Sequence, residues 1–423
     1  MFRRMRDVRD VAELQMCTGC GACAYFRPEQ IRMRDVEGEG LRPELADTEQ
    51  GRRAAAEALA VCPGPALAHD PAQRPAGAIA SLAAGWGPVL ELWEGHASDP
   101  EIRHAASSGG AATALALACM ERLGFAGTLH IRARPEAPER NETVLSTRRS
   151  ELLAATGSRY APASPCDGLG LVEKAPAPCA FIGKPCDVAG ATKARALLPS
   201  LDEKLGVTIG IFCAGTPSTR GTHAMMRRMG VQAGDELRSV RYRGRGWPGL
   251  ARVEVKRGGV TREFTETYAE SWGLLQAYRQ WRCYVCADHT GEFADIAVGD
   301  PWYREIPADE PGRSLILVRS ARGKQVFDAA VAAGYLTVEP AAPEILERSQ
   351  PELLRTRGAI FGRIWTTRLL GAAAPSYRGF PMWRFFRSEL TFRQQAQSFY
   401  GTAKRVFTKR LLVRRRRSPA ESK

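Results

Sequence analysis

The chain has 423 residues, of which 44% are hydrophobic and 25% are charged, and its formal net charge is +14. This composition predicts a folded protein of two or three domains, and the longest apolar run, residues 111–120, is too short to span a bilayer. Because the first residues carry no apolar signal segment, we expect a cytoplasmic protein. Because +8 of the charge lies in residues 401–423 and no nucleic-acid-binding motif accompanies it, we expect no nucleic-acid partner.

The first 75 residues are predicted to form a ferredoxin-like iron-sulfur module. A full two-cluster motif reads C-x2-C-x2-C-x3-C-P, and its fourth cysteine ligates the other cluster. Here Cys17, Cys20 and Cys23 form the triplet, and Cys62 precedes Pro63. The positions that would ligate a second cluster hold Arg27, Arg52, Ala55 and Ala58. The spacing therefore predicts one 4Fe-4S cluster on Cys17, Cys20, Cys23 and Cys62, with a zinc knuckle as the alternative.

The middle of the chain alternates short apolar strands with helices. Residues 71–87 are rich in Ala, Gly and Pro and are typical of a connector. Strands are expected at 89–93, 128–133, 179–182 and 207–212, helices at 110–123, 187–198 and 219–229, and β-hairpins within 240–270. This alternation predicts an α/β core in a mixed α+β protein.

Four further cysteines lie where core strands or loops end. Cys186 follows the strand at 179–182, Cys213 ends the strand at 207–212, and Cys283 and Cys286 form a C-x2-C pair. Crevices of α/β folds open at the carboxyl ends of strands, so these thiols could converge on one site. Single buried cysteines are also common structural residues.

Seven segments of the chain carry a further signal: residues 107–115, 157–160, 183–186, 212–218, 242–248, 283–286 and 294–300. Together they resemble the beta subunit of coenzyme F420 hydrogenases and dehydrogenases. That family includes ferredoxin-dependent reductases of the chlorophyll pathway, and its members carry FAD and 4Fe-4S clusters. The resemblance implies a second cluster on Cys186, Cys213, Cys283 and Cys286. It leaves Cys119, Cys166 and Cys179 as structural thiols.

The resemblance also implies a FAD pyrophosphate site at Ser107, Ser108, Gly109 and Gly110. Ser107 or Ser108 would cap the following helix, and the glycines would let a phosphate approach the positive helix end. A tight turn with a good N-cap is the alternative. The second flavin contact is expected at Gly157, Ser158, Arg159 and Tyr160. There Arg159 would offer charge and Tyr160 an aromatic face.

Several basic and acidic side chains could act on a substrate. Lys184 could raise a cluster potential or bind an anion, or it could simply face solvent. Arg241, Arg243 and Arg245, beside Trp247, suit a loop that grips an acidic planar substrate, or a basic hairpin with a buried Trp. Candidate proton donors are His130, His223, His289 and Asp288, and none is assigned as catalytic.

Residues 341–423 are expected to form a basic helical extension. Within 396–411, one helical face gathers the apolar residues Ala396, Phe399, Tyr400, Ala403, Phe407 and Leu411. Basic residues follow at 414–417. This pattern suits peripheral contact with an anionic membrane, and equally a helix docked on a partner subunit before a solvated tail.

The resemblance implies an iron-sulfur flavoprotein oxidoreductase. Electrons from ferredoxin or reduced coenzyme F420 would pass through two 4Fe-4S clusters to FAD and on to an organic substrate, for which an anion would suit the basic residues. One alternative is a non-catalytic electron-transfer subunit, and another is a zinc-stabilised basic binding protein. Domains are predicted at 1–75 for the ferredoxin-like module, 85–175 and 176–340 for the two parts of the core, and 341–423 for the extension.

Overall fold

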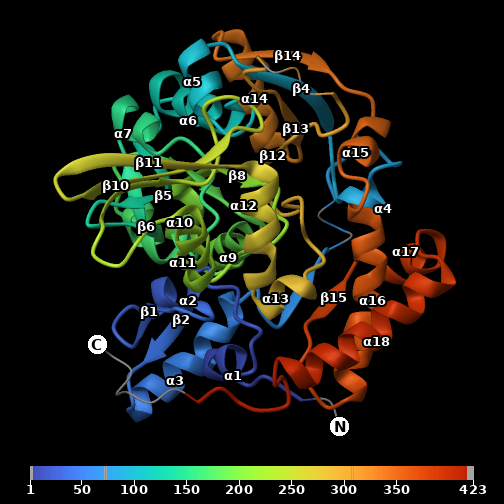
Figure 1. Ribbon diagram of the computed structural model, residues 1–423. Helices are drawn as coiled ribbons and strands as arrows, with labels where there is room; N and C mark the ends of the chain where they lie inside the picture. The colour runs from blue at the N-terminus through green and yellow to red at the C-terminus, as the bar shows by residue number, and fades with distance from the viewer. Residues whose placement is uncertain (1–2, 71, 73, 306, 308, 417–423) are drawn as a thin grey trace.

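An eight-stranded mixed sheet forms the centre of the protein (Figure 1). The computed structural model describes residues 3–70, 72, 74–305, 307 and 309–416. The strand order is β14-β4-β13-β12-β8-β7-β5-β6, and β12, β8, β7 and β5 are parallel neighbours. The strands are β4 Glu91–Ala97, β5 Gly127–Arg134, β6 Ala137–Ser146, β7 Cys179–Gly183, β8 Leu205–Ile211, β12 Ile296–Gly299, β13 Ser314–Val318 and β14 Leu336–Pro340.

Helices cover both faces of this sheet, because successive strand residues point to opposite sides. In β7, Ala180 packs with the layer of α6 and α14, whereas Phe181 packs with the layer of α8 and α9. The helices of the core are α5 Pro100–Ala105, α6 Ala111–Arg122, α7 Arg149–Ala154, α8 Leu169–Glu173, α9 Pro185–Arg195, α10 Pro199–Lys204 and α14 Ala321–Ala332. The predicted α/β class is confirmed, and the expected helices near 110, 187 and 219 correspond to α6, α9 and α11.

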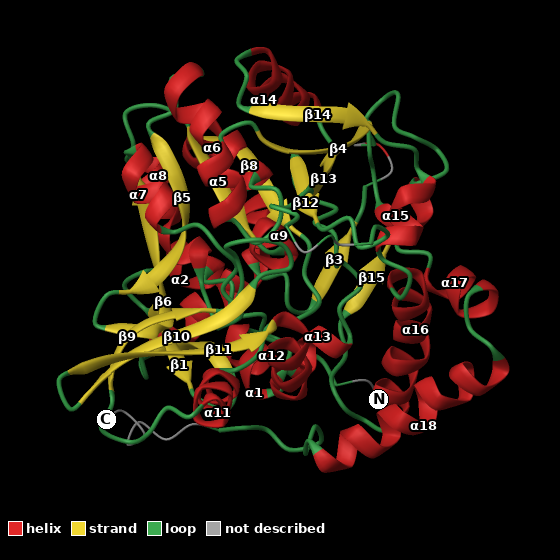
Figure 2. Ribbon diagram, turned by 45° about the horizontal axis from the view of Figure 1, so that its top comes forward, coloured by secondary structure: helices red, strands yellow, loops and turns green. Residues whose placement is uncertain are grey.

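A smaller three-stranded sheet, β11-β10-β9, lies beside the central sheet (Figure 2). It contains the hairpin expected within 240–270. Its elements are β9 Glu236–Arg241, β10 Leu250–Arg257 and β11 Val260–Thr267, and the helices nearby are α11 Thr219–Met229, α12 Tyr268–Leu275 and α13 Trp281–Tyr284. Val253 and Val255 pack with Met225 and Leu275, so this sheet and its helices form their own apolar cluster.

The N-terminal module lies at one end of the molecule (Figure 1). It comprises α1 Val8–Glu13, α2 Ala22–Phe26, β1 Ile31–Val36, β2 Gly40–Leu45, α3 Glu49–Glu57 and β3 Ala66–Ala68, and the short α4 Ala83–Trp86 follows. β1 and β2 are antiparallel, whereas β3 pairs in parallel with β15 Ser376–Arg378 from the C-terminal extension. Figure 2 shows this pair side by side next to α16. The extension thus completes a sheet with the first part of the chain.

Four helices form the C-terminal extension: α15 Glu344–Ser349, α16 Leu353–Leu369, α17 Met382–Ser388 and α18 Phe392–Thr408. The segment after α18 returns to the N-terminal module, where Arg414 pairs with Asp10 and Glu13, and Arg415 pairs with Glu39 at 2.9 Å. Both arginines bind acidic side chains, so the interpretation of this segment as a solvated tail is wrong for them. Arg417, the last of the basic run, lies outside the described residues.

The side of α18 that packs inward differs from the predicted apolar face. Its buried residues are Ser398, Thr402 and Val406, whereas Tyr400 and Phe407 are 77% and 61% exposed. The amphipathic pattern is present, but most of its apolar side is left uncovered. Within the described ranges, no helix is both long enough and apolar enough to cross a membrane.

Candidate functional site

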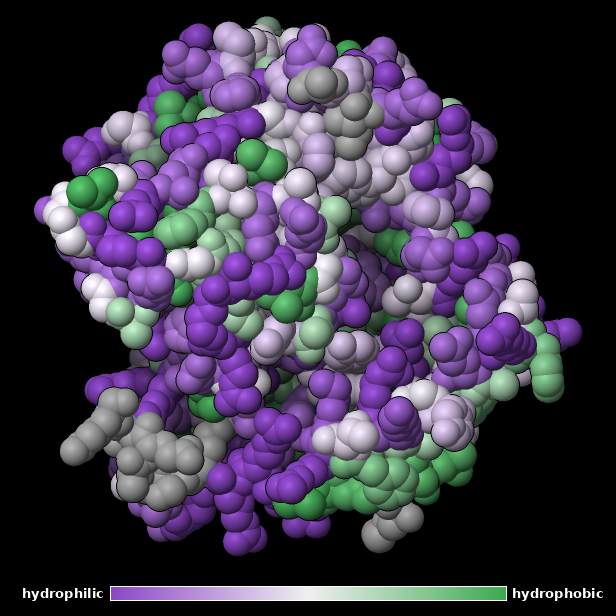
Figure 3. Space-filling view, viewed as in Figure 1, coloured by the Kyte–Doolittle hydropathy of each residue, from purple (hydrophilic) through white to green (hydrophobic). Residues whose placement is uncertain are grey.

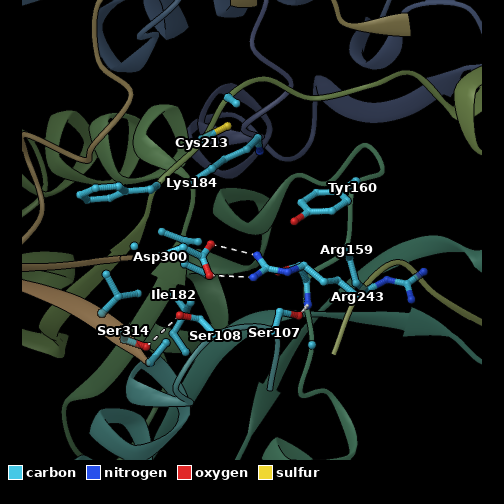
Figure 4. A pocket seen from close by; sticks show the side chains of 18 of the residues that line it. Ser107, Ser108, Arg159, Tyr160, Ile182, Lys184, Cys213, Arg243, Asp300 and Ser314 are labelled. Atoms are coloured by element: carbon cyan, nitrogen blue, oxygen red, sulfur yellow. Dashed lines mark hydrogen bonds and ion pairs between the residues drawn. The ribbon is translucent and has the colours of Figure 1, made fainter. Parts of the chain in front are cut away.

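A cavity of about 650 Å³ opens at the carboxyl ends of the parallel strands, where α/β folds commonly place ligands. Its walls come from the start of α6, the loops that follow β7 and β8, the segment after β12, and α12. In Figure 4, Lys184 and Cys213 lie at one end and Ser107 and Ser108 at the other, with Arg243 and Asp300 between them. Its volume is within the range of cofactor pockets.

Seven of the eight residues predicted to bind flavin line this cavity. They are Ser107, Ser108, Gly110, Gly157, Ser158, Arg159 and Tyr160. Gly109 lies behind them, because a Cβ there would stand 2.8 Å from the backbone of Arg313 and Ser314. The structure therefore brings together two segments that are about fifty residues apart in the chain. The Ser158 N–H donates to the Ser107 hydroxyl and joins them.

The expected serine cap of α6 is wrong. Gly110 is the N-cap, in a left-handed conformation with φ 77°, and no side-chain hydrogen bond caps the helix. Ser108 instead donates to the Arg313 carbonyl at 2.6 Å. Ala111, Ala112 and Thr113 form this first turn and line the cavity, and no side chain caps their N–H groups. An uncapped helix N-terminus in a cavity fits a phosphate group.

Arg159 is arranged differently from the expectation. Its guanidinium donates to the carbonyls of Val240 at 2.9 Å and Pro138 at 2.6 Å, and to the Asn141 side chain. It points away from the centre of the cavity in Figure 4. Burial also lowers its pKa. Arg159 therefore ties β6 to β9, while Tyr160 packs against Trp272 with ring centroids 4.9 Å apart.

One wall of the cavity is an aromatic and charged cluster, of which the sequence indicated Arg243 and Trp247 but not their partners. Arg243 makes a bidentate pair with Asp300 at 2.7 and 2.9 Å, and the Trp247 indole N–H donates to the same carboxylate at 2.8 Å. Tyr268 and Trp302 stack in parallel beneath the Arg243 guanidinium. The hairpin with a buried Trp is thus the better description of this loop. Asp300 is the last residue of segment 294–300, one of the seven that resemble the family, and that segment is the sequence signal that could have identified it.

The cysteines at positions 17, 20, 23 and 62, hereafter the N-terminal cysteine group, are all buried and lie together. Burial and the nearby Cys17, Cys20 and Cys62 raise the pKa of Cys23. The Gly19 N–H points at the Cys17 sulfur, 3.4 Å away. Buried thiols that would repel one another as thiolates fit a site completed by a positively charged metal centre.

The cysteines at positions 186, 213, 283 and 286, hereafter the core cysteine group, also converge. Burial raises the pKa of Cys213, to about 12, and Cys283 and Cys286 add to that rise. Backbone N–H groups of Gly215 and Thr216 point at the sulfurs of Cys213 and Cys283, each at 3.3 Å. Such N–H donors stabilise thiolate sulfur, so these residues also fit a cluster.

The two cysteine groups lie on either side of the first turns of α9. Cys186 is at the start of this helix, and a Cβ at Gly190 would be 3.2 Å from the Cys20 sulfur. Four helical residues span only about 6 Å. Cys166 contacts both α9 and the N-terminal cysteine group. Its thiol donates to the Asp187 carbonyl of α9 at 3.1 Å, and its hydrogen bond with Cys20 lowers the pKa of Cys20. Cys213, a member of the core cysteine group, also lines the cavity and so connects that group with it.

Lys184 is largely buried between the core cysteine group and the cavity, with 16% of its side chain exposed, so its interpretation as a solvent-facing lysine is wrong. Its ammonium contacts both oxygens of Asp187, at 2.6 and 2.7 Å, and the Ala163 carbonyl at 3.3 Å. Burial alone would lower the pKa of Lys184, but Asp187 and Cys186 raise it above its ordinary value. The group is therefore a fixed cation beside the thiols.

The candidate proton donors are dispersed. His223 lies away from the cavity and pairs with Glu37, and the Asp288 carboxylate accepts N–H groups from residues 290, 291 and 292. His130 and His289 line the cavity, and burial lowers the pKa of each to about 4. His289 donates from Nδ1 to the Cys213 carbonyl, and its buried Nε2 has no hydrogen-bond partner among the described residues. A bound ligand could donate to that nitrogen.

Burial of neutral His130 makes stability depend on pH. The unfolded imidazole takes up a proton below about pH 6.5 and the folded one only below about 4, so stability is lost as pH falls through this window. Between about pH 7 and 5, the free energy of unfolding should fall by about 2 kcal/mol more in the unaltered protein than in His130→Gln. Urea titrations at both pH values would measure this, and parallel losses would contradict it.

Within the described residues, no group of three or more His, Cys, Asp or Glu side chains is gathered closely enough to hold a single metal ion. A four-iron cluster is a larger body that separates its four thiolates. Within each cysteine group the thiols lie close enough to raise one another's pKa, and this is compatible with four thiolates around such a cluster. Metal analysis of the purified protein distinguishes iron from zinc at these thiols.

Two family models match most of the core. The first is described as coenzyme F420 hydrogenase/dehydrogenase, beta subunit N-term, and matches residues 92–169. The second describes the C terminus of the same beta subunit and matches residues 178–344. The chain belongs to this family.

One relative and one solved structure, both from Methanosarcina barkeri, are similar to the chain. The coenzyme F420 hydrogenase subunit beta is 24% identical over 257 residues, which are 57% of this chain and 79% of that protein. A chain in a solved structure of the F420-reducing [NiFe] hydrogenase complex is 21% identical, with a TM-score of 0.51, over 66% of this chain and 93% of the other. At this identity, the second comparison supports the fold alone.

Proposed function

We propose that this chain is an iron-sulfur flavoprotein that takes electrons from ferredoxin or reduced coenzyme F420 and delivers them to an organic substrate. Its family is one of oxidoreductase subunits, and its relative in Methanosarcina barkeri is a coenzyme F420 hydrogenase subunit. The observation that carries the proposal is the continuous arrangement from the N-terminal cysteine group, across α9, to the core cysteine group and the cavity. Family membership alone does not identify the donor or the substrate.

In this proposal, each cysteine group holds one 4Fe-4S cluster, and the cavity holds FAD. Clusters exchange single electrons and a flavin exchanges one or two, so together they would allow a two-electron reduction from a one-electron donor. The start of α6 would bind the pyrophosphate, and Tyr160 would supply an aromatic surface. Lys184 would favour added negative charge at the core cysteine group. Arg243, already neutralised by Asp300, would position neighbouring aromatic rings rather than bind an anion.

Purification without oxygen tests the cofactor assignment. We expect a brown protein with about eight irons and one flavin per chain. Reduced ferredoxin or reduced F420 should bleach the flavin absorbance. A colourless preparation that contains zinc would contradict the proposal and favour the basic binding protein.

A non-catalytic role within a complex is the second candidate. It is favoured by the similar proteins, which are a hydrogenase subunit and a chain of a hydrogenase complex. Isolation of the tagged full chain from its native cells distinguishes the two roles. Obligate co-purification with hydrogenase-like subunits, together with no turnover by the isolated chain, would favour the complex. Turnover of an organic substrate by the isolated chain would favour the enzyme.

A further inference from the structure

Exposed apolar side chains are concentrated on the C-terminal helices. Of the fourteen large hydrophobic residues that are exposed in the described chain, nine lie between residues 365 and 413. We define the C-terminal apolar surface as Trp365, Leu369, Trp383, Phe392, Phe399, Tyr400 and Phe407. Figure 3 shows apolar residues gathered over α18 at the lower edge of the molecule. Soluble proteins rarely leave such a group uncovered unless it meets another surface.

This surface is continuous across three helices. Phe361 contacts Trp365 and Trp383 with ring centroids 6.2 and 4.8 Å apart, and Phe386 contacts Phe399 at 5.8 Å. The aromatic residues of α16, α17 and α18 therefore form one continuous cluster, part of which is buried and part exposed.

The packing of α18 holds its apolar side outward. Ser398 sits against Gly362 of α16, where an added Cβ would be 2.1 Å from the serine oxygen. This contact between small residues fixes the rotation of α18 about its axis. Phe392 and Tyr400 are left 85% and 77% exposed on the neighbouring side. Their exposure is therefore a consequence of built packing and not of a loose helix end.

The same region is almost free of acidic residues. Residues 353–416 contain fifteen Lys or Arg and a single acid, Glu389. Some of these cations bind within the protein, as Arg357, Arg414 and Arg415 do. Others are exposed beside the apolar surface: Arg384, Arg387, Arg393, Lys404 and Arg410. On α18, Arg393 and Lys404 lie along the edge of the apolar stripe, opposite the side that packs on α16.

We propose that the C-terminal apolar surface docks on an anionic lipid bilayer. Aromatic side chains that lie in the headgroup region, with Lys and Arg directed at anionic lipids, are the usual means of such attachment. A bilayer is the better partner because the charged residues beside the apolar stripe of α18, Arg393 and Lys404, are both exposed cations and so complement anionic headgroups. The inference stands independently of the cofactors proposed above.

Vesicle sedimentation of the full chain tests this docking. The protein should pellet with vesicles of phosphatidylcholine and phosphatidylglycerol, less with phosphatidylcholine alone, and less again as salt is raised. The triple variant Phe392→Ser/Tyr400→Ser/Phe407→Ser should lower the partition coefficient by roughly 100-fold, since three apolar groups no longer enter the bilayer. These side chains are exposed, so cofactor content and thermal stability should not change.

A control variant alters three exposed apolar residues elsewhere in the protein. Leu171, Leu197 and Val260 are 48%, 49% and 59% exposed on other elements. Their triple replacement by serine should leave vesicle binding unchanged. The proposal is overturned if the unaltered protein stays in the supernatant, if it binds both vesicle types equally, or if the control loses as much binding as the α18 variant. It is also overturned if vesicle-free protein is a dimer that the α18 variant dissociates, because the surface then joins two copies.

Discussion

Replacement of Cys213 by serine should reduce the iron content of anaerobically purified protein from about eight atoms to about four. Cys213 is half-buried in the core cysteine group and also lines the cavity. A serine oxygen is a harder ligand than a thiolate and holds iron-sulfur clusters poorly. Loss of a residue that only hydrogen-bonds to a metal ligand typically lowers activity by roughly 10–100-fold. Because Cys213 would itself be a ligand, the rate at which reduced ferredoxin reduces the bound flavin should fall by more than that. Iron analysis, absorbance spectra and stopped-flow kinetics would measure these effects.

Cys179 offers the matched control for that substitution. It is buried at the start of β7, outside both cysteine groups, and its sulfur lies 3.7 Å from the Ala177 carbonyl. A serine hydroxyl could donate to the same carbonyl, so Cys179→Ser should keep all of its iron. The variant Cys17→Ser should lose the other half of the iron. If Cys213→Ser retains the full complement, the core cysteine group does not bind a cluster.

Replacement of Arg357 by alanine should lower the free energy of unfolding by about 3–5 kcal/mol. Arg357 and Glu292 are both 1% exposed and form an ion pair, and the guanidinium also binds the Ala84 and Ala287 carbonyls at 2.8 and 3.1 Å. Without it, the contact with His69, at 2.7 Å, is left to balance the buried Glu292 carboxylate. Removal of one partner from a buried pair leaves an uncompensated charge, and this is the source of the cost.

Arg355→Ala is the control for this effect. Arg355 is exposed two residues earlier on α16 and pairs with Glu352 at 2.8 Å, so its loss should cost less than about 1 kcal/mol. The double variant Arg357→Met/Glu292→Met should recover much of the stability, because it removes both buried charges. Urea unfolding of the three variants would measure the differences. Equal losses for Arg355→Ala and Arg357→Ala would show that the buried pair is not important for stability.

Local patterns predicted the parts of the protein that depend on nearby residues. The helix expected at 219–229 is α11 without any shift, and the cysteine spacing indicated the N-terminal group, whereas the core group was predicted from the family resemblance. The ion pair of Lys184 with Asp187 is also local, because a side chain at the third helical position reaches back to the residue before the helix. A capping pattern in the sequence could have revealed it.

Other features depend on partners that are distant in the chain and could not be predicted locally. Arg159 was expected to meet a cofactor, but it binds main-chain carbonyls of residues 138, 140 and 240. The aromatic wall needs Tyr268 and Trp302, which are distant in the chain, to stack on each other, and sequence periodicity does not predict that contact. For α18, the pattern identified the apolar side correctly, whereas its exposure depends on how Gly362 and Ser398 pack.

The contacts between the N-terminal module and the C-terminal extension also determine when, during synthesis, the module can finish folding. β3 acquires its neighbour β15 only after residue 378 has been made, and Asp10 meets Arg414 only after residue 414 has been made. Domains at the start of a chain commonly finish folding while the ribosome still makes the rest. Here the N-terminal module can reach its final contacts only after the last helices have emerged. Cys17, Cys23 and Cys62 share an apolar cluster with Val406 and Leu411, so these thiols reach their final surroundings only after residue 411 has been made.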